Sequence, residues 1–247
     1  MKKQAMIFAA GLGTRLKPVT DSLPKALVEI NGKTMLDRVI DNLIRNGYRN
    51  IVVNVHHFAD TIIEHIRRNK YDAEITISDE RELLLDTAGG VRKAIGMIDA
   101  DSPLLIHNAD ILTDIDLSLM TDSLCDDDAL LLCSDRRKSS RYLLFDNDCR
   151  MHGWINENTG EIRPQGILPD SMQKMAFGGI HIVGPKILSA LKSHIENETP
   201  YSIIPFYIDV CNELKIKAYM PTAEYQWFDI GSLEKLNQAR ESYIERT

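Results

Sequence analysis

The sequence predicts an α/β protein with a doubly wound, mainly parallel sheet and a small β-rich insertion at about 136–174. Short apolar runs alternate with segments of helical periodicity through the first half of the 247 residues. These apolar runs are continuous, as expected for strands that are buried on both faces. After about residue 135 the rhythm changes to short β-like runs separated by turn residues, which predicts hairpins.

Each predicted element has its own local signal. Apolar residues at helical spacing predict a helix over 35–44, and Gly47 is placed to end it. Ser232 is placed to cap a polar C-terminal helix. Further helices are predicted around 58–66, 87–98, 186–194 and 203–214, and strands around 5–10, 50–56, 74–78, 103–110, 129–135, 174–183, 215–221 and 224–230. Without a linker or an internal repeat, 1–247 is predicted to be a single domain.

Composition and charge exclude several classes of function. The formal net charge of −7 argues against a general nucleic-acid-binding surface. No apolar run approaches the ~20 residues that span a bilayer, and the apolar run near the N-terminus is too short for a signal peptide. The cysteines are widely spaced and read as reduced thiols: Cys125, Cys133, Cys149 and Cys211. We expect a cytoplasmic protein that binds neither nucleic acid nor a membrane.

The segment MIFAAGLGTRLKPVTDSLPKAL, residues 6–27, has the composition of a phosphate-binding loop. Gly11 and Gly13 allow backbone amides to approach an anion closely. Arg15 offers a planar fork for phosphate oxygens, and Lys25 offers a mobile point charge. Prolines in the same segment restrict the loop and lower the entropy that ligand binding must remove. A polyphosphate matches these features.

Three known phosphate-binding patterns compete for this segment. No GxxxxGK[ST] string follows the first predicted strand, and Leu16 stands where a dinucleotide fingerprint needs its third glycine. The pattern GxGTRxxPxT, followed by a Pro-Lys pair, is present in full: Gly11, Gly13, Thr14, Arg15, Pro18, Thr20, Pro24 and Lys25. It resembles the sugar-1-phosphate nucleotidyltransferase family, also called nucleoside-diphosphate-sugar pyrophosphorylases. The resemblance implies a Rossmann-like nucleotidyltransferase fold over nearly the whole chain.

The resemblance also implies roles for residues along the chain. It makes Arg15 and Lys25 the catalytic residues. Asp110, which ends PLLIHNAD, and Asp229 in WFDIGS match the aspartates that hold Mg²⁺ in the family; carboxylates suit this hard cation. The implied nucleotide-binding residues are Ala10, Gly11, Gly13, Thr14, Thr87, Gly89, Gly90 and Asn108, and the implied sugar-binding residues are Phe177, Gly178, Gly179 and Glu161.

The sequence departs from the family in two places. Many members carry a Glu-Lys-Pro triplet that holds the sugar phosphate, whereas the corresponding stretch here reads TGEIRPQG. Whether Glu161 and Arg163 replace the Glu-Lys pair is left open. We expect no C-terminal β-helix of the kind that regulated and bifunctional members carry, and therefore neither acetyltransferase activity nor that style of allostery.

The expected reaction joins a nucleoside triphosphate and a sugar 1-phosphate to form an NDP-sugar and pyrophosphate. The sugar phosphate is already an anionic nucleophile, so positioning and charge stabilisation suffice. Among short members, the chain looks most similar to N-acetylmuramate-1-phosphate uridylyltransferases, which make a cell-wall precursor. The alternatives are a mannose- or heptose-1-phosphate guanylyltransferase, a phosphocholine cytidylyltransferase, and a nucleotide-sugar-binding regulatory subunit without turnover. We expect a monomer or a small homo-oligomer; the residues leave the nucleobase, sugar and oligomeric state open.

Overall fold

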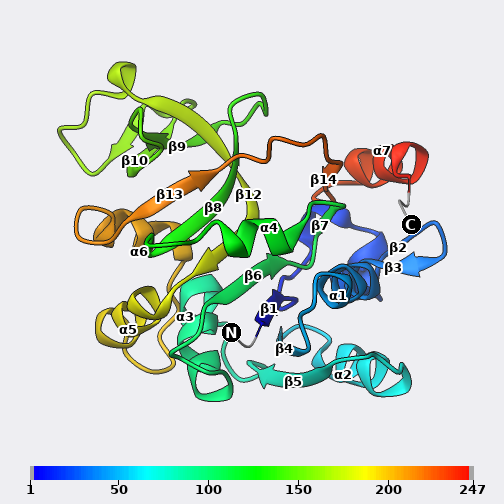
Figure 1. Ribbon diagram of the computed structural model, residues 1–247. Helices are drawn as coiled ribbons and strands as arrows, with labels where there is room; N and C mark the ends of the chain where they lie inside the picture. Colours follow the sequence, from blue (N-terminus) through cyan, green and yellow to red (C-terminus); the bar gives the residue numbers. More distant parts are fainter. Residues whose placement is uncertain (1–2, 245–247) are drawn as a thin grey trace.

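The computed structural model describes residues 3–244, and these form one large mixed sheet with helices on both of its faces (Figure 1). The main sheet has ten strands, of which eight run in the order β11-β10-β9-β12-β6-β1-β4-β5. The remaining two strands branch from this path, because β8 pairs with both β12 and β13. The strand bounds are β1 Gln4–Phe8, β4 Asn50–Val55, β5 Glu74–Asp79, β6 Leu104–Asn108, β8 Ala129–Ser134, β9 Arg141–Phe145, β10 Met151–Asn156, β11 Glu161–Arg163, β12 Gln173–Val183 and β13 Ile216–Tyr219.

The parallel part of the sheet comprises β5, β4, β1 and β6, as the apolar runs predict. At its centre, Ile7 of β1 is in register with Val53 of β4 and His107 of β6. The carboxyl ends of these strands therefore lie along one edge of the sheet, where α/β proteins bind ligands. The doubly wound fold is confirmed in this half.

Antiparallel pairing enters the sheet through β12. This strand runs antiparallel to β6, β8 and β9, and its register shifts between Phe177 and His181. Beyond β9, β10 and β11 continue the antiparallel pattern within the segment predicted to be β-rich. The two late strands do not pair with each other: β13 pairs with β8, and β14 (Trp227–Asp229) pairs with β7 (Ile111–Thr113).

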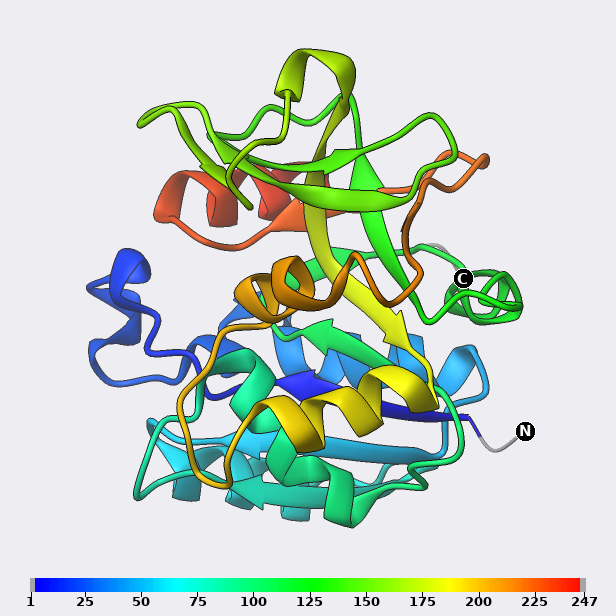
Figure 2. The same cartoon turned by 90° about the vertical axis from the view of Figure 1, so that its left-hand side faces the viewer.

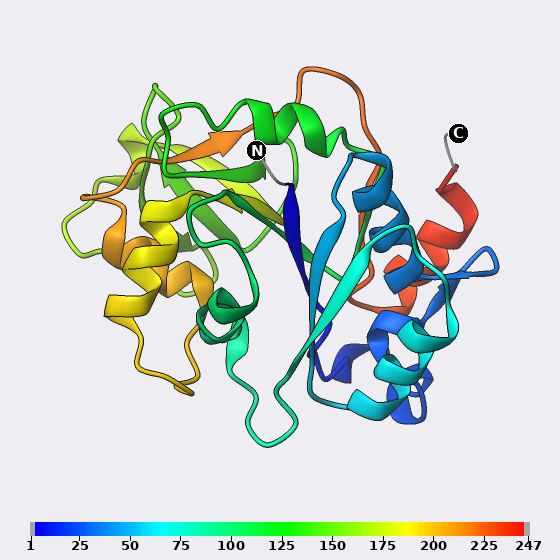
Figure 3. The same ribbon diagram turned by 60° about the horizontal axis from the view of Figure 1, so that its bottom comes forward.

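Neighbouring residues of β1 face different cores, which is why the fold needs helices on both faces. Ile7 packs in one cluster with α1 and α2, and Met6 packs in another with α3, α5 and α6. Figure 3 shows the sheet between these two groups of helices, and Figure 2 looks onto the second group. The helix bounds are α1 Met35–Arg45, α2 Ala59–Arg68, α3 Asp86–Ala94, α4 Leu117–Asp122, α5 Pro185–His194, α6 Ile203–Val210 and α7 Leu233–Ser242.

A third, smaller core holds the predicted phosphate loop against the C-terminal helix. Leu16 of the loop is fully buried there, together with Leu112, Ile230 and Leu236. The short antiparallel pair β2 (Glu29–Ile30) and β3 (Lys33–Thr34) adds Ile30 to this core. Ser232 caps α7, because its hydroxyl accepts a hydrogen bond from the amide of Lys235 (3.3 Å). Burial of Leu16 thus anchors the loop, while its neighbours Arg15 and Lys17 stay exposed.

Within residues 3–244, none of the helices has the length and apolar character that crossing a membrane requires.

Candidate active site

A pocket of about 620 Å³ opens at the carboxyl ends of β1, β4 and β6. Most of the predicted nucleotide-binding and catalytic residues line it, although they come from distant parts of the sequence. Its lining residues include Ala10, Gly11, Gly13, Thr14, Arg15, Lys25, Thr87, Asn108 and Asp110, together with Phe8, Asn54, Leu84, Asp86, Pro200 and Gly231. The structure therefore brings the loop, the Thr87 turn and the end of β6 together around one cavity.

The two loop glycines serve the pocket in different ways. Gly13 has a φ of +65°, and a Cβ there would lie 3.0 Å from the methyl group of Thr20. The Thr20 hydroxyl also donates a hydrogen bond to the Gly13 carbonyl (2.8 Å), so this residue is required by the loop itself. A Cβ on Gly11 would meet no atom within 4 Å. Nothing in the fold demands glycine at position 11, and its open side leaves room for a ligand to reach the backbone.

Lys25 and Asp110 form an ion pair at one end of the pocket. Their side chains are only 14% and 24% exposed, so the pair is shielded from bulk water. Strand β14 joins this end, because the Ile230 amide donates a hydrogen bond to the Asp110 carbonyl (2.8 Å). Asp229 is in register with Ile111, the residue after Asp110. The two predicted metal ligands thus come from neighbouring strands.

Gly231 also lines the first pocket. The sequence analysis did not include it among the site residues. A Cβ there would lie 2.8 Å from a carboxylate oxygen of Asp229 and 3.4 Å from a guanidinium nitrogen of Arg15. The glycine therefore leaves free the space between the Asp229 carboxylate and the Arg15 guanidinium that a side chain at position 231 would fill. Asp229 also pairs with Lys235 at the start of α7 (2.5 Å). Cations and carboxylates meet here, as a phosphate and metal site requires.

Asp110 and Asp229 suit Mg²⁺ by chemistry and number. This cation takes oxygen ligands and usually keeps several waters, with one or two carboxylates from the protein. Among the described residues there is no group of three or more histidine, cysteine or acidic side chains that forms a metal site. A site made of two carboxylates, water and substrate phosphate fits this arrangement; a closed zinc site does not.

Gly89 and Gly90 lie behind the pocket wall and do not line it. The Gly89 amide donates to the Tyr201 carbonyl (3.1 Å), and a Cβ there would lie 2.6 Å from the Thr199 carbonyl oxygen. A Cβ on Gly90 would lie 3.0 Å from a carboxylate oxygen of Glu80. Each glycine has a packing reason of its own, so the predicted nucleotide contacts of Gly89 and Gly90 stay predictions.

A second pocket, of about 520 Å³, lies between the β9–β11 layer and α6. Phe177 and Glu161, two predicted sugar-binding residues, line it, and so do Arg141, Trp154 and Arg163. Glu161 forms an ion pair with Arg163 (2.6 Å). The two pockets adjoin, because Pro200 lines the first and Ser202, two residues later, lines the second.

Gly178 and Gly179 do not line either pocket; they lie where β12 shifts register. Gly179 has a φ of +73°, and a Cβ there would lie 2.9 Å from the side-chain amide nitrogen of Asn108. The Gly178 carbonyl accepts a hydrogen bond from the indole of Trp227 (2.9 Å). They bring β12 close to the end of β6 and to β14, so their position serves the site through packing; direct sugar contact stays a prediction.

Two histidines are buried behind the first pocket, on β6 and β12. Burial lowers the pKa of His107 to about 4 and that of His181 to about 3. His181 shares a hydrogen bond with the Tyr207 hydroxyl (2.9 Å), and its ring lies 6.4 Å from that of Phe8. Both imidazoles are therefore neutral at pH 7 and act as packing groups.

The Nucleotidyl transferase family model matches residues 4–246. The chain belongs to this family. It is 29% identical to the N-acetylmuramate alpha-1-phosphate uridylyltransferase of Caulobacter vibrioides, over 93% of this chain and 92% of that protein. It is 27% identical to the enzyme of the same name from Neisseria meningitidis, over 96% of both chains. The crystal structure of HddC from Yersinia pseudotuberculosis complexed with GMP-PN matches with a TM-score of 0.75 and 25% identity, covering 97% of this chain and 98% of that one.

These likenesses confirm the family and the fold that the loop pattern implied. A nucleotidyl transferase of this family forms NDP-sugars from a nucleoside triphosphate and a sugar 1-phosphate, so the chain is a transferase. The pocket at the carboxyl ends of β1, β4 and β6 combines glycine-rich backbone with the cations Arg15 and Lys25, and these are features that suit a polyphosphate.

Proposed function

We propose that this nucleotidyl transferase transfers a uridylyl group from UTP to N-acetylmuramate 1-phosphate and requires Mg²⁺. One observation carries the proposal: Arg15, Lys25 and Asp110 line the same pocket. In that pocket, Gly11 leaves the loop backbone accessible to a ligand. Two relatives that match more than nine-tenths of the chain bear that enzyme's name, which supports uridylyl transfer and this acceptor.

The chemistry needs alignment and charge neutralisation. The oxygen of the sugar phosphate attacks the α-phosphorus, the bond to the β-phosphate breaks, and pyrophosphate leaves. Arg15 and Lys25 stabilise the negative charge that develops on the phosphate oxygens. Asp110 and Asp229 would hold Mg²⁺, which when bound neutralises triphosphate charge. Lys25 pairs with Asp110 in the structure, so it is placed between the carboxylate and an incoming phosphate.

The second pocket offers a place for the sugar. Cross-strand pairing puts Leu143, Trp154 and Arg163 in one row of the β9–β11 layer. A neighbouring row contains Arg141, Asn156 and Glu161. The pocket thus combines apolar side chains with the guanidinium groups of Arg141 and Arg163, of which Arg163 is paired with Glu161. A guanidinium binds a carboxylate bidentately, and Arg141 would be the group to do so. N-acetylmuramate carries a carboxylate, whereas mannose and heptose do not, so this pocket favours the muramate.

A guanylyl transfer is the second candidate, because HddC was crystallised with GMP-PN and resembles the chain over nearly its whole length. Asp86 at the pocket supports this alternative, since a carboxylate is able to accept hydrogen bonds from guanine N–H groups.

The test is a pyrophosphate-release matrix with Mg²⁺. UTP, GTP, CTP and ATP are each paired with the 1-phosphates of N-acetylmuramate, N-acetylglucosamine, glucose, mannose and heptose. We expect the highest kcat/KM for UTP with N-acetylmuramate 1-phosphate. Pyrophosphate release with GTP and the 1-phosphate of an uncharged sugar, and none with UTP, would refute the proposed substrate pair. Nucleotide binding without turnover on any acceptor would favour a regulatory subunit.

A further inference from the structure

Three parallel strands end beside the first pocket, and a chain of side-chain hydrogen bonds connects their ends. Just after β1, the amide of Ala9 donates to the Asn54 side-chain oxygen (2.8 Å). The Asn54 side-chain amide donates to one carboxylate oxygen of Glu80, just after β5 (2.9 Å). The other carboxylate oxygen of Glu80 accepts from the amide of Leu85 (3.3 Å). The Glu80 carboxylate thus accepts from both the Asn54 side chain and the Leu85 amide, and Asn54 links it to Ala9.

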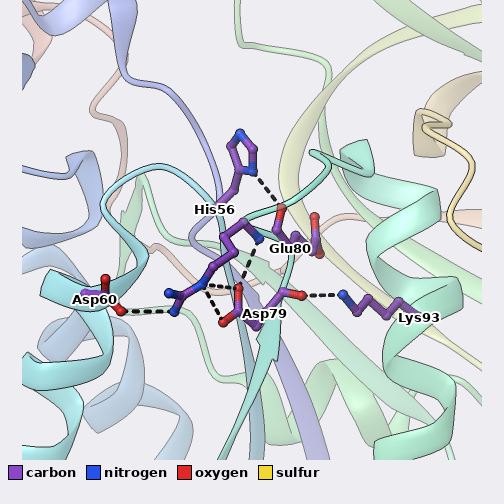
Figure 4. Close-up of polar contacts among 6 residues, drawn as sticks. His56, Asp60, Asp79, Glu80 and Lys93 are labelled. Carbon is purple, nitrogen blue, oxygen red and sulfur yellow. Dashed lines mark hydrogen bonds and ion pairs between the residues drawn. The ribbon is translucent and has the colours of Figure 1, made fainter.

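Both side chains of the chain are buried, Asn54 with 3% and Glu80 with 1% of its surface exposed. Burying a carboxylate is costly, and burial raises the pKa of Glu80. The surrounding backbone is held as well: His56 shares a hydrogen bond with the Glu80 carbonyl (2.7 Å), and Lys93 donates to the Asp79 carbonyl, as Figure 4 shows. Stability alone would favour an apolar pair here, so its presence points to positioning.

The absence of a side chain at Gly90 makes room for this pair. A Cβ there would lie 3.0 Å from the Glu80 carboxylate oxygen and 3.2 Å from the Asn54 amide nitrogen. The glycine that resembled a nucleotide contact in the sequence therefore accommodates the buried hydrogen-bond chain.

We propose that Asn54 and Glu80 form a positioning relay that sets the phosphate loop and the start of α3 relative to each other. Ala9, held at one end, immediately precedes Ala10 and the other loop residues of the pocket, and Leu85, held at the other end, immediately precedes α3. Glu80 does not itself line the pocket, so it acts through the groups that it holds, whereas Asn54 also lines the pocket. Because its object is the nucleotide site, the inference rests on the proposed function.

Because the hydrogen bonds have a fixed direction, the relay is testable by exchanging the amide of Asn54 and the carboxylate of Glu80. In Glu80→Gln, the new amide group faces either Asn54 or the Leu85 amide, and both are donors, so one hydrogen bond is lost. In Asn54→Asp, two carboxylates face each other across the relay, which disfavours their joint ionisation. In the double variant the exchanged side chains again match. The carboxylate at position 54 accepts from Ala9 and from the new amide at position 80, whose oxygen accepts from Leu85.

The test compares wild type, Glu80→Gln, Asn54→Asp and the double variant, with Glu82→Gln as the control on an exposed side chain of the same segment. Steady-state kinetics give the KM of UTP, the KM of N-acetylmuramate 1-phosphate and kcat, and calorimetry gives the Kd of UTP with Mg²⁺. We expect each single variant to raise the KM and Kd of UTP about tenfold, the size of one lost hydrogen bond, with the KM of the sugar phosphate within twofold of wild type. The double variant is expected to return to within about threefold of wild type.

Two results would overturn the relay. One is a double variant no better than the poorer single variant. The other is a set of variants that lose thermal stability while the KM and Kd of UTP stay unchanged. Wild type that binds UTP but turns over no acceptor would refute the proposed function and leave the Kd comparison to decide the relay. If wild type bound neither UTP nor GTP, both proposals would fail.

Discussion

The ion pair between Lys25 and Asp110 gives the sharpest mutational prediction. Lys25→Met removes the cation but keeps an apolar stem of similar length. The folded protein loses one ion pair whose side chains are 14% and 24% exposed. Such a pair contributes about 1 kcal/mol, a small share of the ~5–15 kcal/mol that stabilises a domain. The expected fall in melting temperature is therefore only about 2–4 °C.

Turnover is expected to suffer far more than stability. If the proposed function holds, Lys25 faces phosphate oxygens when substrate is bound, and one lost charge contact in such a site costs about 3 kcal/mol. This corresponds to a loss of roughly a hundredfold in kcat/KM. Pyrophosphate release measures the rate, and thermal unfolding measures the stability. Lys17→Met is the matched control, because Lys17 lies in the same loop, is 62% exposed and forms an ion pair with Asp21 (3.2 Å) on the surface. Unchanged kcat/KM in Lys25→Met would remove Lys25 from the active site.

Three further predictions follow from the same structure. Asp110→Asn and Asp229→Asn should each weaken Mg²⁺ dependence and turnover, with a double variant little worse than the poorer single one; full activity of Asp229→Asn at limiting Mg²⁺ would contradict a shared site. His107 and His181 have folded-state pKa values of about 4 and 3, below the unfolded value of about 6.5, so the stability they permit is complete above pH 6.5 and is lost as the pH falls. At pH 5 each should cost about 2 kcal/mol in urea unfolding, and a flat profile from pH 7 to 5 would exclude this cause. Gly89→Ala should destabilise the fold by more than about 1 kcal/mol, since its Cβ would lie 2.6 Å from the Thr199 carbonyl oxygen. A melting temperature equal to that of wild type would show that the segment containing Thr199 moves away at no cost.

The sequence predicted the parallel half of the fold and the spatial meeting of the loop with Asp110. Continuous apolar runs predict buried parallel strands, and parallel strands bring their carboxyl ends to one edge. The resemblance of the loop pattern to the family implied a common site for Arg15, Lys25 and Asp110, and all three line the first pocket. The loop pattern also implied the family that the comparison with known proteins confirms.

The parts that sequence reasoning missed depend on contacts between distant segments. Gly89 is a nucleotide-binding residue only by resemblance to the family, and its packing role appears from the approach of the 199–201 segment. Glu80 looks like any acidic residue after a strand, and its burial appears only once Asn54 and Leu85 surround its carboxylate. The late strands were recognised, but their partners were not, because pairing between remote strands has no local signal.

The central claim is that the chain breaks the bond between the α- and β-phosphates of a nucleoside triphosphate and joins the α-phosphate to a sugar phosphate. The most direct measurement follows two labels in UTP, one at the α-phosphorus and one at the γ-phosphorus, with N-acetylmuramate 1-phosphate and Mg²⁺. We expect the α-label to enter the nucleotide sugar and the γ-label to leave as pyrophosphate, at equal rates. Release of the γ-label as orthophosphate, with the α-label retained in UDP, would contradict it.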